Sequence, residues 1–418
     1  MRATKDSGLE WIGVIPAGWS LSKIGQVYRL RNTKVSDTDY PPLSVTNKGI
    51  VPQLDTAAKT NAHDDRKLVK RGDFAINSRS DRRGSCGISD YDGSVSLINT
   101  ILAPLNEMNP GYYDWLFHTV QFGDEFYKFG HGIVDDLWTT GWQEMKKITI
   151  PTPPLHEQQR IADFLDAKCA EIDALTADIQ TQINTLEQYK RSVITETVTK
   201  GLNPDAEMKD SGIEWVGEIP AHWLVHPVYY YYGERKNKNY LGKEDNLLSL
   251  SYGRVVRKDI NTSDGLLPES FNTYNIVETG DIIIRPTDLQ NDKRSLRTGL
   301  VKEHGIITSA YIDLCPIKQV DSRYFYFLLH AYDVMKVFYN MGNGVRQGLN
   351  YSEFSRLMVF EPPYDEQVAM ADYLEAKVEE VDVVISDKKA QLATLDEYKK
   401  SLIFEYVTGK KEVSEGAD

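Results

Sequence analysis

The chain has 418 residues, a formal net charge of −13, 41% hydrophobic and 26% charged residues, and three cysteines. This length predicts two to four domains with the composition of a globular protein. No apolar run approaches the roughly 20 residues that span a bilayer, and the N-terminus lacks a signal-peptide core, so we expect a cytoplasmic protein. Cys86, Cys169 and Cys315 are scattered without a C-x-x-C pair, which argues against a disulfide scaffold and against a zinc cluster.

Two phrases of the chain each occur twice. "KDSGLEWIGVIPAGW" (5–19) recurs as "KDSGIEWVGEIPAHW" (209–223) with 11 of 15 positions identical, and residues 153–200 match 362–409 without a gap at 22 of 48 positions. A period of roughly 205 residues excludes a solenoid, whose units run about 20–50 residues. The sequence therefore predicts a tandem duplication with these parts: a first domain (1–152), a central spacer helix (153–202), a second domain (203–361), a C-terminal spacer helix (362–411) and a disordered tail (412–418).

Within the two domains, the first matched pair of segments ends in clustered arginines. "LVKRGDFAINS" (68–78) parallels "IVETGDIIIRP" (276–286), and each reads as a Gly-Asp turn, an apolar strand and then a basic loop. The planar guanidinium suits phosphates and the O6/N7 edge of guanine, so both loops are candidate DNA contacts. The candidates here are Arg79, Arg82 and Arg83 in the first copy, and Arg285, Lys293, Arg294 and Arg297 in the second.

A second matched pair of segments contains a Gly-x-Gly loop. "FYKFGHGIVDDL" (126–137) parallels "FYNMGNGVRQGL" (338–349). The candidates for reading base edges are His131 in the first copy and Asn343, Arg346 and Gln347 in the second. Further basic residues on predicted loops are Lys48, Arg254, Arg257 and Lys258. For any single one of these, a solvated surface charge is the alternative interpretation.

The two spacer segments predict long helices. Both start Pro-Pro-x-x-Glu-Gln, which suits a first helical turn, and neither contains Gly or Pro again before Gly201 and Gly409. Apolar residues then recur at spacings of three and four, which predicts a buried seam along a helix of about 40–45 residues. An antiparallel pair within one chain is the favoured arrangement, and a homo-oligomeric coiled coil is the alternative. The predicted seam residues are Ile172, Ile179, Ile183, Leu186 and Val193 on the first helix and Val381, Ile385, Leu392, Leu395 and Leu402 on the second. The lysines on the seam, Lys190, Lys388 and Lys399, are expected to extend to solvent or to pair with acids.

The acidic charge lies mainly in the helices. The first domain has a net charge of zero and the second −3, whereas the two helical segments carry −3 and, with the tail, −7. Local basic clusters matter more to a polyanion than the global charge does, so the total of −13 does not exclude DNA binding.

Motifs for catalysis are missing from the sequence. "EPPY" (361–364) resembles an amino-methyltransferase loop, but its repeat partner "TPPL" (152–155) leads into a helix in the same way. There is no G-x-x-x-x-G-K-[ST] loop and no H-E-x-x-H or similar metal spacing. We therefore predict no catalytic residues and no bound metal.

Taken together, these features resemble the specificity (S) subunit of type I restriction–modification systems. The opening "KDSGIEWVGEIP-HW" and the long helix that runs from Pro-Pro-x-x-Glu-Gln to "YKRSVI" or "YKKSLI" carry the resemblance, which covers nearly the whole chain. It implies an α/β (α+β) protein with two pseudo-repeated target-recognition domains separated by two long antiparallel helices that form an intramolecular coiled coil. It also implies a non-catalytic subunit that binds an interrupted double-stranded DNA target, one half-site per recognition domain.

The same resemblance implies the partners. Two methyltransferase (M) subunits and the restriction/translocase (R) subunits would dock on the helices, and they, not this chain, would use S-adenosylmethionine, ATP and Mg²⁺. A coiled-coil adaptor that joins two protein-binding modules without binding DNA is the alternative from another class. A phage-borne or orphan S subunit that redirects a host's M and R subunits would have the same sequence features.

Overall fold

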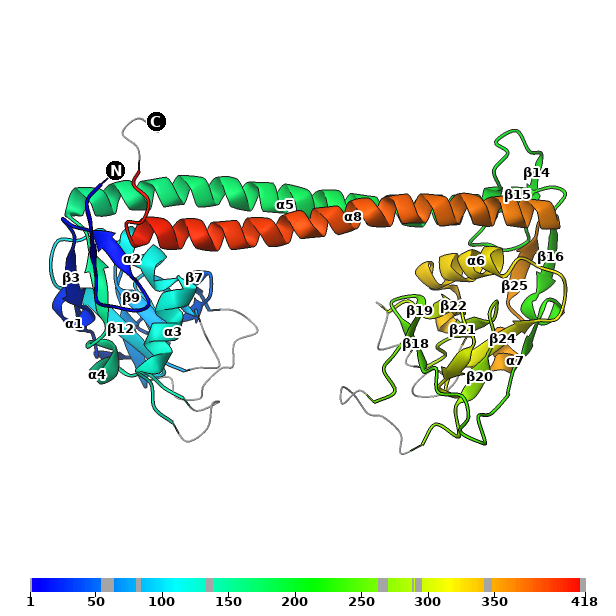
Figure 1. Cartoon of the computed structure of the whole chain (residues 1–418), viewed down its shortest axis with the longest axis horizontal. Helices are drawn as coiled ribbons and strands as arrows, with labels where there is room; N and C mark the ends of the chain where they lie inside the picture. Colours follow the sequence, from blue (N-terminus) through cyan, green and yellow to red (C-terminus); the bar gives the residue numbers. More distant parts are fainter. Residues whose placement is uncertain are drawn as a thin grey trace. The chain divides into compact units, whose positions relative to one another are not determined.

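The computed structural model describes residues 2–53, 64–79, 84–132, 138–261, 270–287, 289, 295–341 and 348–413 (Figure 1). The chain forms two compact units. Unit 1 comprises Met1–Gln180 and Ala390–Asp418, and unit 2 comprises Thr181–Lys389. Both unit boundaries fall inside the long helices α5 (Leu155–Lys200) and α8 (Tyr364–Val407), so each helix contributes one half to each unit.

Unit 1 is built around a four-stranded antiparallel sheet in the order β10-β9-β12-β4, with a three-stranded sheet β11-β8-β5 and the pairs β1-β2, β3-β13 and β6-β7. A buried aromatic cluster that includes Trp19, Tyr28, Phe74 and Phe117 fills its main core. The strands are β1 (Thr4–Asp6), β2 (Val14–Pro16), β3 (Ser20–Lys23), β4 (Tyr28–Leu30), β5 (Lys34–Val35), β6 (Leu43–Thr46), β7 (Gly49–Pro52), β8 (Arg66–Val69), β9 (Phe74–Asn77), β10 (Cys86–Ile88), β11 (Gly93–Ser96), β12 (Asn99–Pro104) and β13 (Thr149–Thr152). The short helices are α1 (Ile24–Val27), α2 (Pro110–Phe117), α3 (Val120–Lys128) and α4 (Trp142–Met145).

Unit 2 has a four-stranded antiparallel sheet in the order β17-β24-β21-β22, with the pairs β14-β15, β16-β25, β18-β19 and β20-β23. The strands are β14 (Met208–Asp210), β15 (Glu218–Pro220), β16 (Leu224–Pro227), β17 (Tyr232–Glu234), β18 (Leu248–Ser251), β19 (Arg254–Arg257), β20 (Asn275–Val277), β21 (Ile282–Ile284), β22 (Thr298–Leu300), β23 (Gly305–Ile307), β24 (Ile312–Pro316) and β25 (Met358–Glu361). The helical segments are η3 (Val228–Tyr230), α6 (Ser322–Val334), η4 (Val337–Asn340) and α7 (Tyr351–Phe354).

The two main sheets repeat the same strand order. Strands β4, β12, β9 and β10 of unit 1 correspond in chain order and pairing to β17, β24, β21 and β22 of unit 2. The predicted Gly-Asp turn and apolar strand are present in both units, because β9 starts directly after Asp73 and β21 directly after Asp281. These strands are fully buried, as expected of the central part of a sheet that is covered on both faces.

Each long helix begins directly after a Pro-Pro pair and ends close to a glycine. Helix α5 starts after Pro154 with Glu157 in its first turn, where an acid complements the helix dipole, and α8 starts after Pro363 with Asp365 and Glu366 there. Gly201 directly follows α5, and Gly409 lies two residues after the end of α8, at φ values of +76° and +70°. Only glycine adopts this left-handed conformation without strain, so it stops both helices.

Contacts between the helices run in opposite directions along the chain. In unit 1, Phe164 packs against Tyr406 with ring centroids 4.4 Å apart, and the Lys399 Nζ lies 2.6 Å from the Asp173 Oδ1. In unit 2, Gln182 accepts from Lys388 at 2.5 Å. Rising residue numbers on α5 therefore meet falling numbers on α8, which confirms the predicted antiparallel pair within one chain. The predicted seam residues Ile172, Ile179, Ile183, Val381, Ile385 and Leu402 are buried, and Leu186, Val193, Leu392 and Leu395 are half-buried.

The repeated opening phrase fastens each unit to the start of a long helix. The Trp19 Nε1 donates to the Glu157 carboxylate at 2.9 Å, and the Trp223 Nε1 donates to the Glu366 carboxylate at 3.0 Å. Both tryptophans are buried and both acids are the Glu of Pro-Pro-x-x-Glu-Gln. In each unit, the repeated opening phrase and the repeated helix start are therefore the two sides of one contact.

The same tryptophans also meet the end of the other long helix. A Cβ added to Gly201 would lie 3.3 Å from the Trp223 ring, and one added to Gly409 would lie 2.9 Å from the Trp19 ring. Each unit thus holds the first turn of one helix and the last turn of the other. Any side chain at Gly409 would also meet Pro16 at 2.5 Å, so the close approach requires glycine there.

Candidate nucleic-acid interface

In unit 1 the two predicted loops leave the folded domain at adjacent positions. Arg79 and His131 each form an antiparallel bridge with Thr139. The Thr140 amide donates to the Ser78 carbonyl at 3.0 Å, and the Tyr127 hydroxyl donates to the Arg79 carbonyl at 3.1 Å. Arg79 and His131 are exposed. The segment that carries the arginines and the segment that carries Gly-x-Gly therefore leave the fold from one place.

Unit 2 repeats this arrangement through an equivalent hydrogen bond. The Leu349 amide donates to the Pro286 carbonyl at 3.0 Å. Leu349 directly precedes Asn350, the N-cap of α7, just as Thr140 directly precedes Gly141, the N-cap of α4. In both units the start of the basic segment thus lies beside the residues that follow the Gly-x-Gly loop.

A hairpin packs beside these loops in each unit. Hairpin β6-β7 lies against β10 in unit 1, where a Cβ on Gly87 would come within 2.8 Å of the Gly49 backbone. Hairpin β18-β19 lies against β22 in unit 2, where a Cβ on Gly299 would meet Leu250 at 2.5 Å and Val255 at 3.0 Å. Strands β10 and β22 are the strands that follow the two basic segments. Lys48 is exposed at the tip of the first hairpin.

Other predicted contacts in unit 2 are on the surface but pair with acids. Arg254 forms an ion pair with Asp382 of α8, and the Arg257 guanidinium lies 2.5 Å from the Glu303 carboxylate. Lys258 is exposed next to Arg257, and Arg285 is half-buried. Ion pairs at exposed sites are worth little, about 0–1 kcal/mol, so these arginines can exchange their acid for a phosphate at small cost.

Arg297 has a different place from the one predicted. Its side chain is fully buried, its Nε donates to the Tyr339 hydroxyl at 2.9 Å, and its Nη1 donates to the carbonyl of Thr287. Its backbone amide donates to the Asp333 carboxylate. This burial argues against DNA contact by Arg297, because its donors are already used to hold the backbone at the base of the basic segment. The sequence pattern cannot separate a buried arginine from an exposed one in the same cluster.

Seven predicted contacts lie outside the described residues. They are Arg82, Arg83, Lys293, Arg294, Asn343, Arg346 and Gln347.

An arginine–aspartate pair supports the Gly-Asp turn of each unit and was not predicted from the sequence. The Arg31 guanidinium bonds both oxygens of Asp73 at 2.5 and 3.0 Å, and that of Arg235 bonds both oxygens of Asp281 at 2.8 and 3.0 Å. The bidentate bond to the carboxylate raises the pKa of both arginines. Each aspartate also accepts a backbone amide of its own turn. The signal was available, since both arginines stand three residues after a matched tyrosine, Tyr28 or Tyr232, at the ends of corresponding strands.

No group of three or more His, Cys, Asp or Glu side chains in the part of the chain that the structure describes could hold a metal ion. None of the helices among the described residues combines the length and the apolar character needed to cross a membrane.

Comparison with known protein families gives one matching family model. Residues 16–185 match the type I restriction modification DNA specificity domain.

Two curated relatives come from Methanocaldococcus jannaschii. A putative type I restriction enzyme MjaX specificity subunit is 25% identical over 273 residues, which cover 64% of this chain and 60% of the relative. The type I restriction enzyme MjaVIII specificity subunit is 25% identical over 346 residues, covering 76% of this chain and 75% of the relative. The chain thus matches less than two thirds of the first relative's length.

Solved structures share the fold. A chain from a study of complex assembly and conformational transition of the type I restriction–modification system superposes with a TM-score of 0.72 at 13% identity, covering 95% of this chain and 99% of that one. The HsdS subunit from Thermoanaerobacter tengcongensis superposes with a TM-score of 0.53 at 14% identity, covering 97% of this chain and all of that one. At these identities the similarity shows the fold alone, and it agrees with the predicted fold class.

Proposed function

We propose that the chain belongs to the type I restriction–modification specificity-subunit family and reads a two-part DNA target for a methyltransferase and restriction complex. Its family-model match over residues 16–185, its curated relatives and its fold support this proposal. In this proposal each unit reads one half-site of double-stranded DNA. The chain itself performs no chemistry and binds no cofactor. The methyltransferase and restriction subunits supply S-adenosylmethionine, ATP and Mg²⁺ chemistry.

One observation carries the proposal. In both units the start of the basic segment lies beside the residues that follow the Gly-x-Gly loop, through the matching bonds Thr140–Ser78 and Leu349–Pro286. The frame around them repeats, whereas the segments differ in sequence between the units. A fixed frame with two different loop sets is what recognition of two different half-sites requires, because phosphate contacts position a protein and base contacts specify the site.

The long helices fit two further parts of the proposal. Each is continuous from one unit into the other, with 46 residues in α5 and 44 in α8. We propose that their length sets the unread gap between the half-sites. Their acidic surface suits docking of partner proteins better than contact with DNA, and the near-neutral units suggest that tight DNA binding depends on those partners.

The test shortens both helices equally. Residues 178–184 and 387–393 are repeat-equivalent, and they lie opposite each other because Gln182 meets Lys388. Deleting both heptads keeps the seam in register and removes about 10 Å of helix, equivalent to about three base pairs. We expect the cellular methylation pattern to keep both half-sites with a shorter gap.

The control replaces exposed side chains in the same two heptads by alanine without changing their length. It should leave the gap unchanged. An unchanged gap after the double deletion contradicts the proposed role of the helices. Partner binding without salt-sensitive DNA binding would instead favour a coiled-coil adaptor of two protein-binding modules.

A further inference from the structure

The hairpin β18-β19 of unit 2 has an unusual residue at its tip. Ser251 pairs with Arg254, so the turn consists of Tyr252 and Gly253 alone. Their φ angles are +47° and +79°, which is the arrangement of a type I′ turn. The first position of this turn strongly favours Asn, Asp or Gly, because a bulky side chain is strained at positive φ.

Packing does not account for the tyrosine. Its side chain is 89% exposed. An exposed ring adds no packing that would offset the strain of its backbone. Strained residues of this kind cluster at functional positions.

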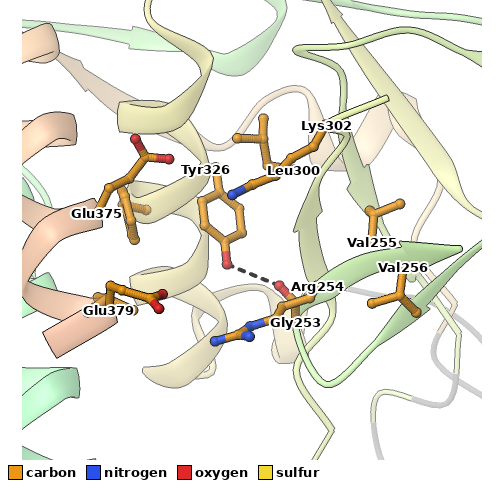
Figure 2. Close-up of a pocket in the computed structure, with 11 residues that line it drawn as sticks. Gly253, Arg254, Val255, Val256, Leu300, Lys302, Tyr326, Glu375 and Glu379 are labelled. Atoms are coloured by element: carbon orange, nitrogen blue, oxygen red, sulfur yellow. Dashed lines mark hydrogen bonds between the residues drawn. The ribbon is translucent and has the colours of Figure 1, made fainter. Parts of the chain in front are cut away.

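The rest of the tip is held in place. The Tyr326 hydroxyl of α6 donates to the Gly253 carbonyl at 3.0 Å (Figure 2). The Arg254 side chain pairs with Asp382 of α8. Asp382 also accepts Lys190 of α5 at 2.5 Å. The inner side of the hairpin borders a hollow of about 450 Å³ that Val255, Lys302 and Glu379 help to line (Figure 2). The ring of Tyr252 is therefore presented on a fixed support.

The tip lies beside the end of the basic segment. Leu296, two residues after Arg294, contacts the tip, since a Cβ on Gly253 would meet its side chain at 3.0 Å. Tyr252 and Leu296 also line a second hollow, of about 180 Å³, together with Lys190 and Arg191 of α5. The acids Glu187 and Asp382 line it as well, so basic groups outnumber acidic ones there once Arg254 is counted.

The corresponding hairpin of unit 1 supports the same interpretation. Strands β6 and β18 share the pattern Leu-Ser-x-Ser/Thr, and the tip that follows β6 carries the exposed Lys48. Lysine and tyrosine are both side chains that bond phosphate oxygens. The residue of unit 1 that corresponds to Tyr252 is Asn47, and Lys48 follows it, so the two tips present different phosphate-binding groups from neighbouring positions.

We propose that Tyr252 contacts the DNA duplex next to the half-site read by unit 2, with its hydroxyl bonded to a backbone phosphate and its ring against the adjoining sugar. This inference rests on the proposed function and adds a contact that the predicted basic residues do not include. In this inference, a tyrosine occupies a position that disfavours it because its ring contacts DNA and does not stabilise the fold.

The test replaces Tyr252 by the residue that its turn prefers. Tyr252→Asn suits a type I′ turn, so the full-length chain should melt at the same temperature or higher. Assembled with its methyltransferase subunits, the variant should bind a duplex carrying the mapped target with a Kd raised about 5- to 30-fold, as expected for loss of one phosphate bond and its ring contact. Tyr252→Phe should fall between the variant and the wild type. Tyr240→Asn, at another tyrosine of unit 2 that is 76% exposed, is the matched control and should leave the Kd unchanged.

The outcomes separate the inference from the proposed function. Unchanged DNA affinity of Tyr252→Asn, in a complex whose wild type binds the target, overturns the inference alone. Unchanged DNA affinity with weakened methyltransferase binding also overturns it, and assigns the tip to a protein contact. A wild-type complex without any salt-sensitive affinity for DNA refutes the proposed function itself.

Discussion

Asp313 on β24 offers a stability test that follows directly from the sheet of unit 2. Its side chain is 1% exposed and faces Asp281, and the Arg235 guanidinium that bonds Asp281 stays 3.9 Å from it. Burial, followed by the charge of Asp281, raises the pKa of Asp313 to about 8. The corresponding residue of unit 1 is Ile101, since both carbonyls accept the amide of the arginine in the matching pair. Unit 2 thus has a carboxyl group at the position where unit 1 has an aliphatic side chain.

The sign of the effect is set by the two states. Between pH 4 and pH 8 the folded state holds a proton on Asp313 that the unfolded state releases, so this group lowers the free energy of unfolding as the pH rises. Each pH unit costs about 1.4 kcal/mol, which gives at most about 4 kcal/mol at pH 7. Above pH 8 the loss is complete, and below pH 4 it is absent.

The perturbation is Asp313→Asn, which has nearly the same shape and is neutral at every pH. We expect the variant to unfold with a free energy higher by about 2–4 kcal/mol at pH 7.5 and nearly equal at pH 4.5. Urea unfolding at a series of pH values measures the difference, and hydrogen exchange of the β21 and β24 amides assigns it to unit 2. Asp387→Asn, at an exposed acid of α8, changes the charge equally and should show no such trend. A difference that does not grow between pH 4.5 and 7.5 would refute the reasoning.

Three further substitutions test the contact between Trp19 and Glu157 and the different positions of Arg79 and Arg297. Glu157→Gln leaves Trp19 without a charged acceptor and should lower the free energy of unfolding of unit 1 by about 1–3 kcal/mol in thermal or urea unfolding, whereas an unchanged stability would mean that this contact contributes little. Arg79→Ala should weaken DNA binding and its salt dependence without changing stability, but Arg297→Met should cost about 3 kcal/mol or more because several backbone and side-chain acceptors lose their donor; equal effects of the two on stability would contradict their assigned positions.

The ends of the long helices and the central strands could be predicted because each occurs in both copies of the repeat. Helix starts at Pro-Pro-x-x-Glu-Gln, stops at Gly201 and Gly409, and strands after Asp73 and Asp281 all depend on local rules of capping, periodicity and turns. Because each local signal occurs at matching positions of the two copies, the two copies support each other's prediction. The seam lysines show the same: Lys190 and Lys399 are 209 residues apart, and each pairs with an acid of the other helix.

The parts that could not be predicted depend on partners far apart in the chain. Trp19 meets Glu157 across 138 residues, so no local pattern links them. Arg31 meets Asp73 across 42 residues, and the only signal for this pair is its recurrence as Arg235 and Asp281 in the second copy. Arg297 was grouped with its exposed neighbours because burial of a single arginine depends on Tyr339 and on the backbone of Thr287. Tyr252 was missed because the strain that singles it out is a backbone angle.

The positions that are identical in the two copies and those that differ have different roles in the structure. Trp19 and Trp223 each touch the first turn of one long helix and the end of the other, so a change at either residue disturbs two helix ends at once. Such positions resist divergence, since a broken contact costs stability in both the unit and the helix pair. The segments that follow Ser78 and Pro286 leave the fold next to a backbone hydrogen bond, and in unit 2 the buried Leu289 and Arg297 anchor the segment to the core. A chain built in this way can alter what one unit reads while the frame of both units stays intact, which is the property that two independent reading units need.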